Sequence, residues 1–336
     1  MAFWPACDEA CARLMSPDLL SRPSALALEG ASQDLVGKLP ALLMEARRVA
    51  MTVAQGTHGR RRAGPGETFW QYRNFEAGDS SAQIDWRRSA SSSHLFVRER
   101  EWEAAHTVWI WIDLSPSMHF RSALARTSKA ERAVVLALAL ATLLSEAGER
   151  VGVPGVMEPK ARHNTATVMM EALARSLKSF DGLPDANNRL SRHSEMVIFS
   201  DFLEPELALA ALFNKFAVQG VRGHLMQILD PAEESLPYEG RIEFIDAESG
   251  AHYVAERAET LRAEYQQKLA AHKAAIALHA GNVAWTPFLH HTNRPAVEAL
   301  LPLHMHLSGL EKAYRAKGLI KGQNDGKNGA GRNGLS

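Results

Sequence analysis

The strongest constraint on the fold is an alternation of short apolar strands and longer helical segments that begins at Thr107. The segment TVWIWID, residues 107–113, is a continuous apolar run typical of a parallel strand buried on both faces. A helix is expected over 128–147, because the apolar spacing is helical and Gly148 follows as a stop. Strands separated by helices predict an α/β fold with a doubly wound, mostly parallel sheet and right-handed crossovers.

The alternation of expected strands and helices continues to residue 307. The expected elements are strands at RVGVPG, EMVIFSD, GHLMQILD and NVAWTPFL, a hairpin in GRIEFIDAESGAHYVAER with its turn around 248–250, and helices over 165–180, 204–218, 256–280 and 295–307.

A helix is also expected near the N-terminus. Apolar residues recur at steps of three or four from Leu35 to Val53. The helix is expected to begin at Ser32, or at Pro40, where a first-turn proline is tolerated. The stretch before it, to about residue 31, is expected to be poorly ordered.

The chain is therefore expected to have four parts. The segment between the helix and the first buried strand is rich in turn residues and in alternating aromatics, which predicts a β-rich unit with a small aromatic core. The Gly- and Asn-rich end has almost nothing to bury, which predicts disorder. The parts are 1–55 (lead-in and helix), 56–106 (β-rich unit), 107–310 (α/β domain) and 311–336 (tail).

Composition excludes several classes of protein. The 38 Lys and Arg residues balance 38 Asp and Glu residues, so the basic excess of a nucleic-acid binder is absent. The longest apolar run, Val134 to Leu144, is about half of the roughly 20 residues that a membrane span needs. No targeting segment is recognised, and a cytoplasmic protein without membrane insertion is expected. Cys7 and Cys11 could supply at most half of a zinc site.

Oxygen-bearing side chains follow the expected strands. Asp113, Ser115 and Ser117 come directly after the first buried strand, and Asp201 ends a later one. In an open α/β sheet, ligands bind beyond the carboxyl ends of the strands, so these side chains are expected to converge. Carboxylates and hydroxyls suit a hard cation such as Mg²⁺. Either of two threonines is a candidate to complete the set, Thr165 or Thr167.

The alternative is that these residues only form turns and helix caps. Catalysis is not expected. There is no G-x-S-x-G elbow and no P-loop, and a haloacid-type phosphatase would need an Asp at the position of Ser115. A metal-dependent phosphoester hydrolase is the third-ranked hypothesis.

Two family resemblances rest on these residues. DLSPS after an apolar strand, with the later Asp201, resembles the metal-ion-dependent adhesion site of von Willebrand factor A domains. Upstream, G-x-H-x-R at 56–60, then GPGETFWQYRNFEAGD, IDWRRSA and LFVREREWE, closely resemble the bacterial family called domain of unknown function fifty-eight. The resemblance implies an A-like domain preceded by a β segment, with metal ligands at Asp113, Ser115, Ser117 and Asp201.

The resemblance also implies a partner. Members of that family are typically encoded beside MoxR-type AAA+ ATPases, which implies a non-enzymatic adaptor in protein complex assembly or maturation. The sequence departs from the usual pattern at Phe202, where A domains commonly have Gly, and at Ala82 and Gln83, where basic residues are frequent in the family. The middle threonine motif is also unusual, HNTAT at 163–167.

The β-rich unit carries the second function hypothesis, a metal-independent scaffold that docks through its tryptophans Trp70, Trp86 and Trp102. Its charged residues are either a partner-binding surface or, as we favour, an internal salt-bridge network. The charged residues are Arg73, Asp79, Asp85 and Arg87, and Trp86 belongs to the same candidate partner-binding surface.

Overall fold

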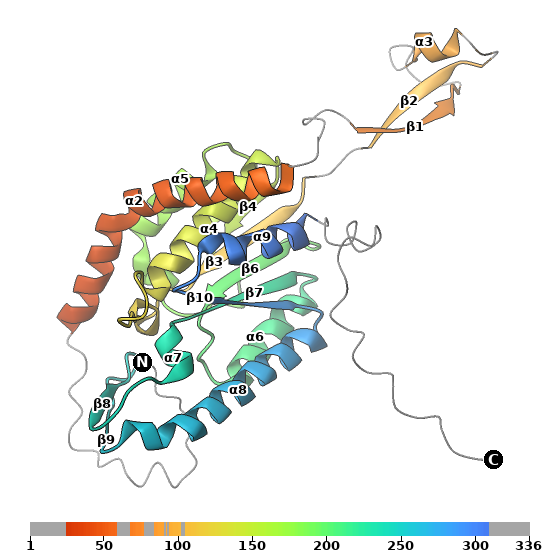
Figure 1. Cartoon of the computed structure of the whole chain (residues 1–336). Helices are drawn as coiled ribbons and strands as arrows, with labels where there is room; N and C mark the ends of the chain where they lie inside the picture. The colour runs from red at the N-terminus through yellow and green to blue at the C-terminus, as the bar shows by residue number, and fades with distance from the viewer. Residues whose placement is uncertain are drawn as a thin grey trace, which may run out of the picture.

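The structure is a computed structural model that describes residues 25–58, 68–76, 84–90, 92, 94–101 and 105–308 (Figure 1). Both cysteines, the first 24 residues and the segment after 308 lie outside this part of the chain, as does Asp79. The expectations for residues 1–24, for the tail and for these residues therefore stay predictions, whereas residues 25–31, expected to be poorly ordered, are helical.

A six-stranded sheet forms the centre of the molecule, in the order β10-β7-β6-β3-β4-β5. All neighbouring pairs are parallel except β4 and β5, so the predicted mixed α/β architecture with a mostly parallel sheet is confirmed. The strands are β3 (Thr107–Ile112), β4 (Arg150–Val153), β5 (Met157–Lys160), β6 (Glu195–Ser200), β7 (Arg222–Leu229) and β10 (Thr286–His291).

Strand β5 was not expected from the sequence. It lies at the edge of the sheet, where its residues are only partly buried or exposed, so it lacks the apolar run of the central strands. Strand β10 begins four residues later than the segment NVAWTPFL suggests, because residues 282–285 form the end of a helix and a turn.

Helices cover both faces of this sheet. In Figure 1, α2, α4 and α9 lie on one side and α6 and α8 on the other. The helices are α2 (Ala25–His58), α4 (Lys129–Glu146), α5 (Thr165–Arg175), α6 (Glu206–Val218), α7 (Pro231–Ser235), α8 (Ala258–Asn282) and α9 (Ala296–Leu307), with 3₁₀ turns η2 (Pro116–His119) and η3 (Leu177–Phe180).

Helix α4 is apolar nearly all round because it contacts both the sheet and α2. It begins with a capping box, in which Ser128 accepts from the Glu131 amide and the Glu131 carboxylate accepts from the Ser128 amide. It ends as predicted before Gly148, whose φ of 84° suits a glycine.

Two helix expectations were wrong in their bounds. Helix α2 begins at Ala25, well before Ser32, and continues through Pro40. Buried leucines on both sides of the exposed proline, Leu35 and Leu42, keep one face packed and hold the helix together. The helix expected over 165–180 instead ends at Arg175 and is followed by the 3₁₀ turn η3.

The segment before β3 forms a separate antiparallel pair, β1 (Thr68–Asn74) and β2 (Phe96–Glu101), with the short helix α3 (Trp86–Ser89) between them. The segment predicted to be β-rich thus contains a pair of strands. Trp86, however, is 63% exposed and does not belong to a core. Trp109 and Trp111, at the end of the Trp-rich stretch, are buried in the main core.

A second small antiparallel pair lies between β7 and α8. Its strands are β8 (Ile242–Ile245) and β9 (His252–Ala255), which confirms the predicted hairpin. It has its own small apolar cluster, separate from the main core, around Phe244, Leu236 and Ala258.

Candidate cation and partner-binding site

The sheet reverses its order between β3 and β6. From β3 the chain moves to β4 on one side and later to β6 on the other, so the carboxyl ends of β3 and β6 lie at the switch point. Asp113 follows β3 and Asp201 follows β6, and both are almost fully buried. These two strand ends are joined by hydrogen bonds: Ser200, the last residue of β6, donates to Asp113, and Ser117, after β3, donates to Asp201.

Asp113 is held by two hydrogen bonds. Its Oδ1 accepts from the Ser115 amide at 2.8 Å, and its Oδ2 accepts from the Ser200 hydroxyl at 2.6 Å. Burial, together with the charge of Asp201, raises the pKa of Asp113 to about 6. Hydrogen bonds from Ser200 and Ser115 oppose this rise in the pKa but do not cancel it. Because the ionised form of this buried carboxylate is destabilised, a nearby positive charge would stabilise it.

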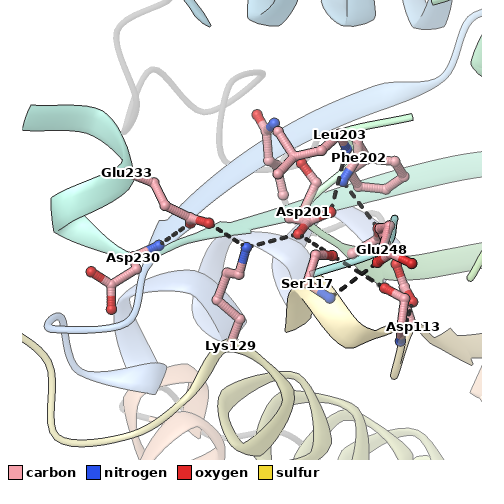
Figure 2. Close-up of polar contacts among 12 residues, drawn as sticks. Asp113, Ser117, Lys129, Asp201, Phe202, Leu203, Asp230, Glu233 and Glu248 are labelled. Carbon is pink, nitrogen blue, oxygen red and sulfur yellow. Dashed lines mark hydrogen bonds and ion pairs between the residues drawn. The ribbon is translucent and has the colours of Figure 1, made fainter. Parts of the chain in front are cut away.

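The two serines connect the strand ends. Ser115 Oγ lies 3.3 Å from Ser117 Oγ, and Ser117 Oγ donates to Asp201 Oδ2 at 2.8 Å. Both serines are buried, in the loop and 3₁₀ turn that follow β3. The oxygens predicted to act together are therefore adjacent (Figure 2).

A lysine that the sequence analysis did not select reaches the same carboxylate. Lys129 Nζ lies 2.7 Å from Asp201 Oδ2 and 2.6 Å from Glu233 Oε1, and its side chain is fully buried. Burial works to lower the pKa of Lys129, but the charges of Asp201 and Glu233 outweigh it and raise the pKa. The lysine is thus a built-in cation that balances part of the acidic charge.

Glu233 belongs to a second capping box, at the start of α7. Asp230 accepts from the Ala232 amide, while Glu233 Oε2 accepts from the Asp230 amide at 2.8 Å. The other Asp230 oxygen accepts from the Ser122 amide. Burial raises the pKa of Glu233 in spite of the opposing effect of Lys129. The buried ion pair between Lys129 and Glu233 therefore carries a desolvation cost.

Two more carboxylates lie close to the strand ends. Glu204 Oε2 is buried and has no hydrogen-bond partner among the described residues, and burial with the charges of Asp113 and Asp201 raises the pKa of Glu204 to about 8. Glu248, in the turn between β8 and β9, accepts from the Ser117 amide at 3.0 Å through Oε1. Burial and the charge of Asp201 raise its pKa as well.

Phe202, directly after Asp201, adopts an unusual backbone conformation. Its φ of 53° lies in the left-handed region that favours glycine, where the resemblance had pointed to a departure from the A-domain pattern. The conformation is fixed from three directions: the side chain is fully buried, the amide donates to Ser200 Oγ, and the carbonyl accepts from His272. The fold holds this strain at the end of β6.

The two candidate threonines are not brought into this set. Thr165 Oγ1 donates to the Arg162 carbonyl, and Thr167 Oγ1 accepts from Arg47 at 3.3 Å. Neither hydroxyl bonds to the aspartates or serines among the described residues. Their place in a metal site stays a prediction without support from these contacts.

The residues proposed for partner binding on the β-rich unit are only partly described. Asp85 caps α3 by accepting from the Arg88 amide, while Trp86 and Arg87 are exposed. The backbone of Arg73 lies in β1 opposite Val97, and its side chain is outside the described part. Asp85 therefore acts as a helix cap, Trp86 and Arg87 face solvent, and the choice between a partner-binding surface and a salt-bridge network stays a prediction.

Within the described ranges, no group of three or more His, Cys, Asp or Glu side chains is arranged to hold a metal ion. The predicted set contains only two carboxylates and relies on hydroxyls for its other oxygens, so it does not need such a group. None of the described helices is long and apolar enough to cross a bilayer.

Comparison with known proteins places the chain in a family. The family model described as protein of unknown function DUF58 matches residues 71–275. The chain belongs to this family. The matched region of this DUF58 member includes Asp113, Lys129, Asp201 and Glu248, so every part of the site lies within the family domain.

Relatives extend the likeness beyond that region. The uncharacterized proteins Rv1480 of Mycobacterium tuberculosis and Mb1516 of Mycobacterium bovis are each 27% identical over 283 residues, which cover 78% of this chain and 86% of theirs. Two solved structures match at 16% identity. They are a conserved hypothetical protein BatB from Bacteroides thetaiotaomicron (TM-score 0.37) and an aerotolerance-related membrane protein from Bacteroides fragilis (TM-score 0.34), which cover 62% and 61% of this chain and 100% of theirs.

Four residues at the site were not predicted from the sequence: Lys129, Glu233, Glu204 and Glu248. A signal existed for two of them. Lys129 follows the Ser128 cap directly, where a cation opposes the helix dipole, and Glu233 is the fourth residue of the capping-box pattern DPAE. For Glu204 and Glu248 no local pattern exists, because their approach depends on how distant segments pack.

Proposed function

We propose that this protein is a non-enzymatic adaptor that binds an acidic side chain of a protein partner through a Mg²⁺ ion. The residues that would hold the ion are Asp113, Ser115, Ser117 and Asp201. The observation that carries the proposal is the convergence of these four oxygen-bearing side chains, all buried, at the switch point of the sheet. In this proposal the site corresponds to the metal-ion-dependent adhesion site of von Willebrand factor A domains.

The residues present suit a hard cation. All the donors are oxygens, which Mg²⁺ prefers. The raised pKa of Asp113 and the unpartnered Glu204 oxygen both point to acidic charge that the surrounding protein does not fully neutralise. Lys129 balances part of this charge through Asp201. One divalent cation beside Asp113 would compensate more of it.

When bound, the ion would offer a coordination position to a carboxylate from outside the chain. The chain's own residues supply the rest: Ser200 and the Ser115 amide orient Asp113, and Lys129 with Ser117 orients Asp201. We propose a MoxR-type AAA+ ATPase as the partner, on the basis of the family resemblance. Such an ATPase would supply the mechanical work that the adaptor lacks.

The test is a thermal-shift titration with Mg²⁺, followed by pull-down from the native host with and without EDTA. We expect Mg²⁺ to raise the Tm of the wild type and not of Asp113→Asn, and EDTA to remove the captured partner. Asp34→Asn, a change of the same kind at an exposed helix position, is the matched control and should keep both effects. Partner capture that is unaffected by EDTA and by Asp113→Asn would refute the metal-dependent function.

A second candidate function has its own observation. Trp86, in α3 of the β1–β2 unit, is 63% exposed, and Leu95, directly before β2, is 42% exposed. Exposed aromatic residues are enriched where proteins dock. A metal-independent scaffold that docks through this unit predicts that Trp86→Ala abolishes partner capture while Asp113→Asn does not.

A further inference from the structure

A second group of polar side chains lies at the carboxyl end of β10, the edge strand that β7 separates from β6. The group consists of His290 in β10, Thr292 in the turn that follows, and Arg132 near the start of α4. Arg132 Nη2 donates to the Thr292 carbonyl at 3.2 Å, although 160 positions separate the two residues. Helix α4 therefore places a guanidinium against the turn after β10.

Each of these three side chains has a buried polar atom without a hydrogen-bond partner among the described residues. The atoms are Arg132 Nε, His290 Nε2 and Thr292 Oγ1. The Thr292 amide donates to the Leu229 carbonyl and continues the ladder between β10 and β7, so the side chains of His290 and Thr292 leave the strand on the same face. These two residues are only 3% and 2% exposed. Buried polar atoms are ordinarily paired, so the group lacks a partner that a ligand would supply.

The positive charge of Arg132 is poorly compensated. Its side chain is 11% exposed, and its ion pair with Glu45 Oε1 is long, at 3.7 Å. Its Nη2 donates to Thr127 Oγ1 at 3.4 Å and to the Thr292 carbonyl at 3.2 Å, whereas hydrogen bonds from a guanidinium to a carboxylate are usually about 2.7–2.9 Å. Burial lowers the pKa of Arg132 because it destabilises the charged form. A closely bound anion would stabilise this guanidinium.

The neighbouring groups add hydrogen-bond donors without adding a full charge. Burial and the charge of Arg132 lower the pKa of His290 to about 3, so its imidazole is neutral near pH 7. A neutral imidazole and a hydroxyl can each donate one hydrogen bond. Helix α9 begins at Ala296, shortly after Thr292, without a side-chain cap, and the positive end of its dipole lies toward the same turn. The group thus offers one positive charge and three donors.

We propose that Arg132, His290 and Thr292 form a carboxylate-binding site, separate from the proposed cation site. The three unpartnered atoms would donate to the two oxygens of one carboxylate, which enters beside the exposed turn residues Asn293 and Arg294. One positive charge matches a single carboxylate, whereas a phosphate dianion would leave excess negative charge. A small organic acid and an acidic side chain of a protein present the same chemistry.

The test uses the full chain with acetate as the probe, without a divalent cation and at constant ionic strength in chloride. Acetate should shift the NMR resonances of the His290 imidazole. Thr292→Val keeps the shape of the side chain and removes the hydroxyl, so it should weaken acetate binding about ten-fold. Without acetate this variant should unfold at the wild-type temperature or above, because it loses a buried hydroxyl that has no partner.

Ser145→Ala is the matched control. It removes another buried hydroxyl without a partner among the described residues, at the opposite end of α4, and should leave acetate affinity unchanged. Arg132→Lys keeps the charge, removes the planar fork of the guanidinium and should also weaken binding. Because no divalent cation is present, these results are independent of the cation site.

Three results would overturn the proposal. The first is a His290 shift with acetate no larger than with chloride, and the second is unchanged acetate affinity in both Thr292→Val and Arg132→Lys. The third is a lower unfolding temperature of Thr292→Val without acetate, which would show that the hydroxyl already has a partner. Tighter binding of phosphate than of acetate would overturn the carboxylate class. Competition by a Glu-containing peptide or by succinate would support the site and distinguish the two sources.

Discussion

The strand ends of β3 and β6 and the β8–β9 hairpin contribute to one site, but they are built in different ways. Asp113 and Asp201 follow strands whose residues are almost all buried in the main core. Glu248 belongs to a two-stranded hairpin with a small cluster of its own and two exposed apolar residues, Ile245 and Val254. The comparison teaches that the ends of β3 and β6 are fixed by the main core, whereas the hairpin that contacts them depends on a small apolar cluster of its own.

The largest effect is expected from breaking the buried ion pair on the rigid side. Lys129→Met should destabilise the protein by about 3–5 kcal/mol, because Asp201 and Glu233 are left buried without their cation. The measurement is chemical denaturation at neutral pH. Lys268→Met, which removes an exposed ammonium paired with Glu264, is the control and should change the midpoint little. Equal midpoints for the two variants would contradict the structural role of Lys129.

Two phenylalanine-to-alanine substitutions, one in the main core and one in the hairpin cluster, test whether these two regions are stabilised separately. Phe199→Ala in β6 should cost about 3–5 kcal/mol of global stability, because it opens a cavity in the main core. Phe244→Ala in β8 should have a much smaller effect on the midpoint and should instead speed amide exchange within 242–255. Native-state hydrogen exchange followed by mass spectrometry distinguishes the two. If Phe244→Ala also loosened β3 and β6, the hairpin would not be separable.

The pH dependence of Glu204 gives a smaller effect. Its folded-state pKa of about 8 lies above the ordinary 4.5, so the folded chain binds more protons between these values and stability falls as pH rises through this window. Glu204→Gln removes the titration, and its stability relative to wild type should rise with pH by at most about 1.4 kcal/mol per unit. Denaturation at pH 5, 7 and 8.5 measures the trend. Glu158→Gln, an exposed control, should show none.

The smallest effect is expected in the turn of the β8–β9 hairpin. Asp246→Ala removes side-chain support from the hairpin turn and should cost about 1 kcal/mol or less, while exchange of the Ser117 amide becomes faster as Glu248 leaves it. Asp185→Ala, which removes a similar turn at Asn187, is the control and should leave the Ser117 amide protected. Unchanged exchange at Ser117 in Asp246→Ala would show that the turn does not position Glu248.

Most of the fold could be predicted because its signals are local. The buried run of β3, the helical spacing of α4 and the hairpin around 248–250 each depend on neighbouring residues. The errors occurred where packing overrides local patterns. Pro40 is tolerated inside α2 because the helix packs on both sides of it, and β5 is an edge strand without an apolar run.

The site was predicted in part for the same reason. Asp113, Ser115 and Ser117 are adjacent in sequence, and Asp201 follows a recognisable strand. Thr165 and Thr167 were chosen from a local motif, but their hydroxyls bond to Arg162 and Arg47.

The sequence by itself determined the layered α/β architecture and the two strand ends that carry Asp113 and Asp201, because periodicity and topology rules act on short segments. The tertiary structure alone decided which charges meet them. Lys129 reaches Asp201 across 72 positions, and Glu248 reaches Ser117 across 131. Such contacts arise from the packing of whole elements, which sets the balance of charge at the site.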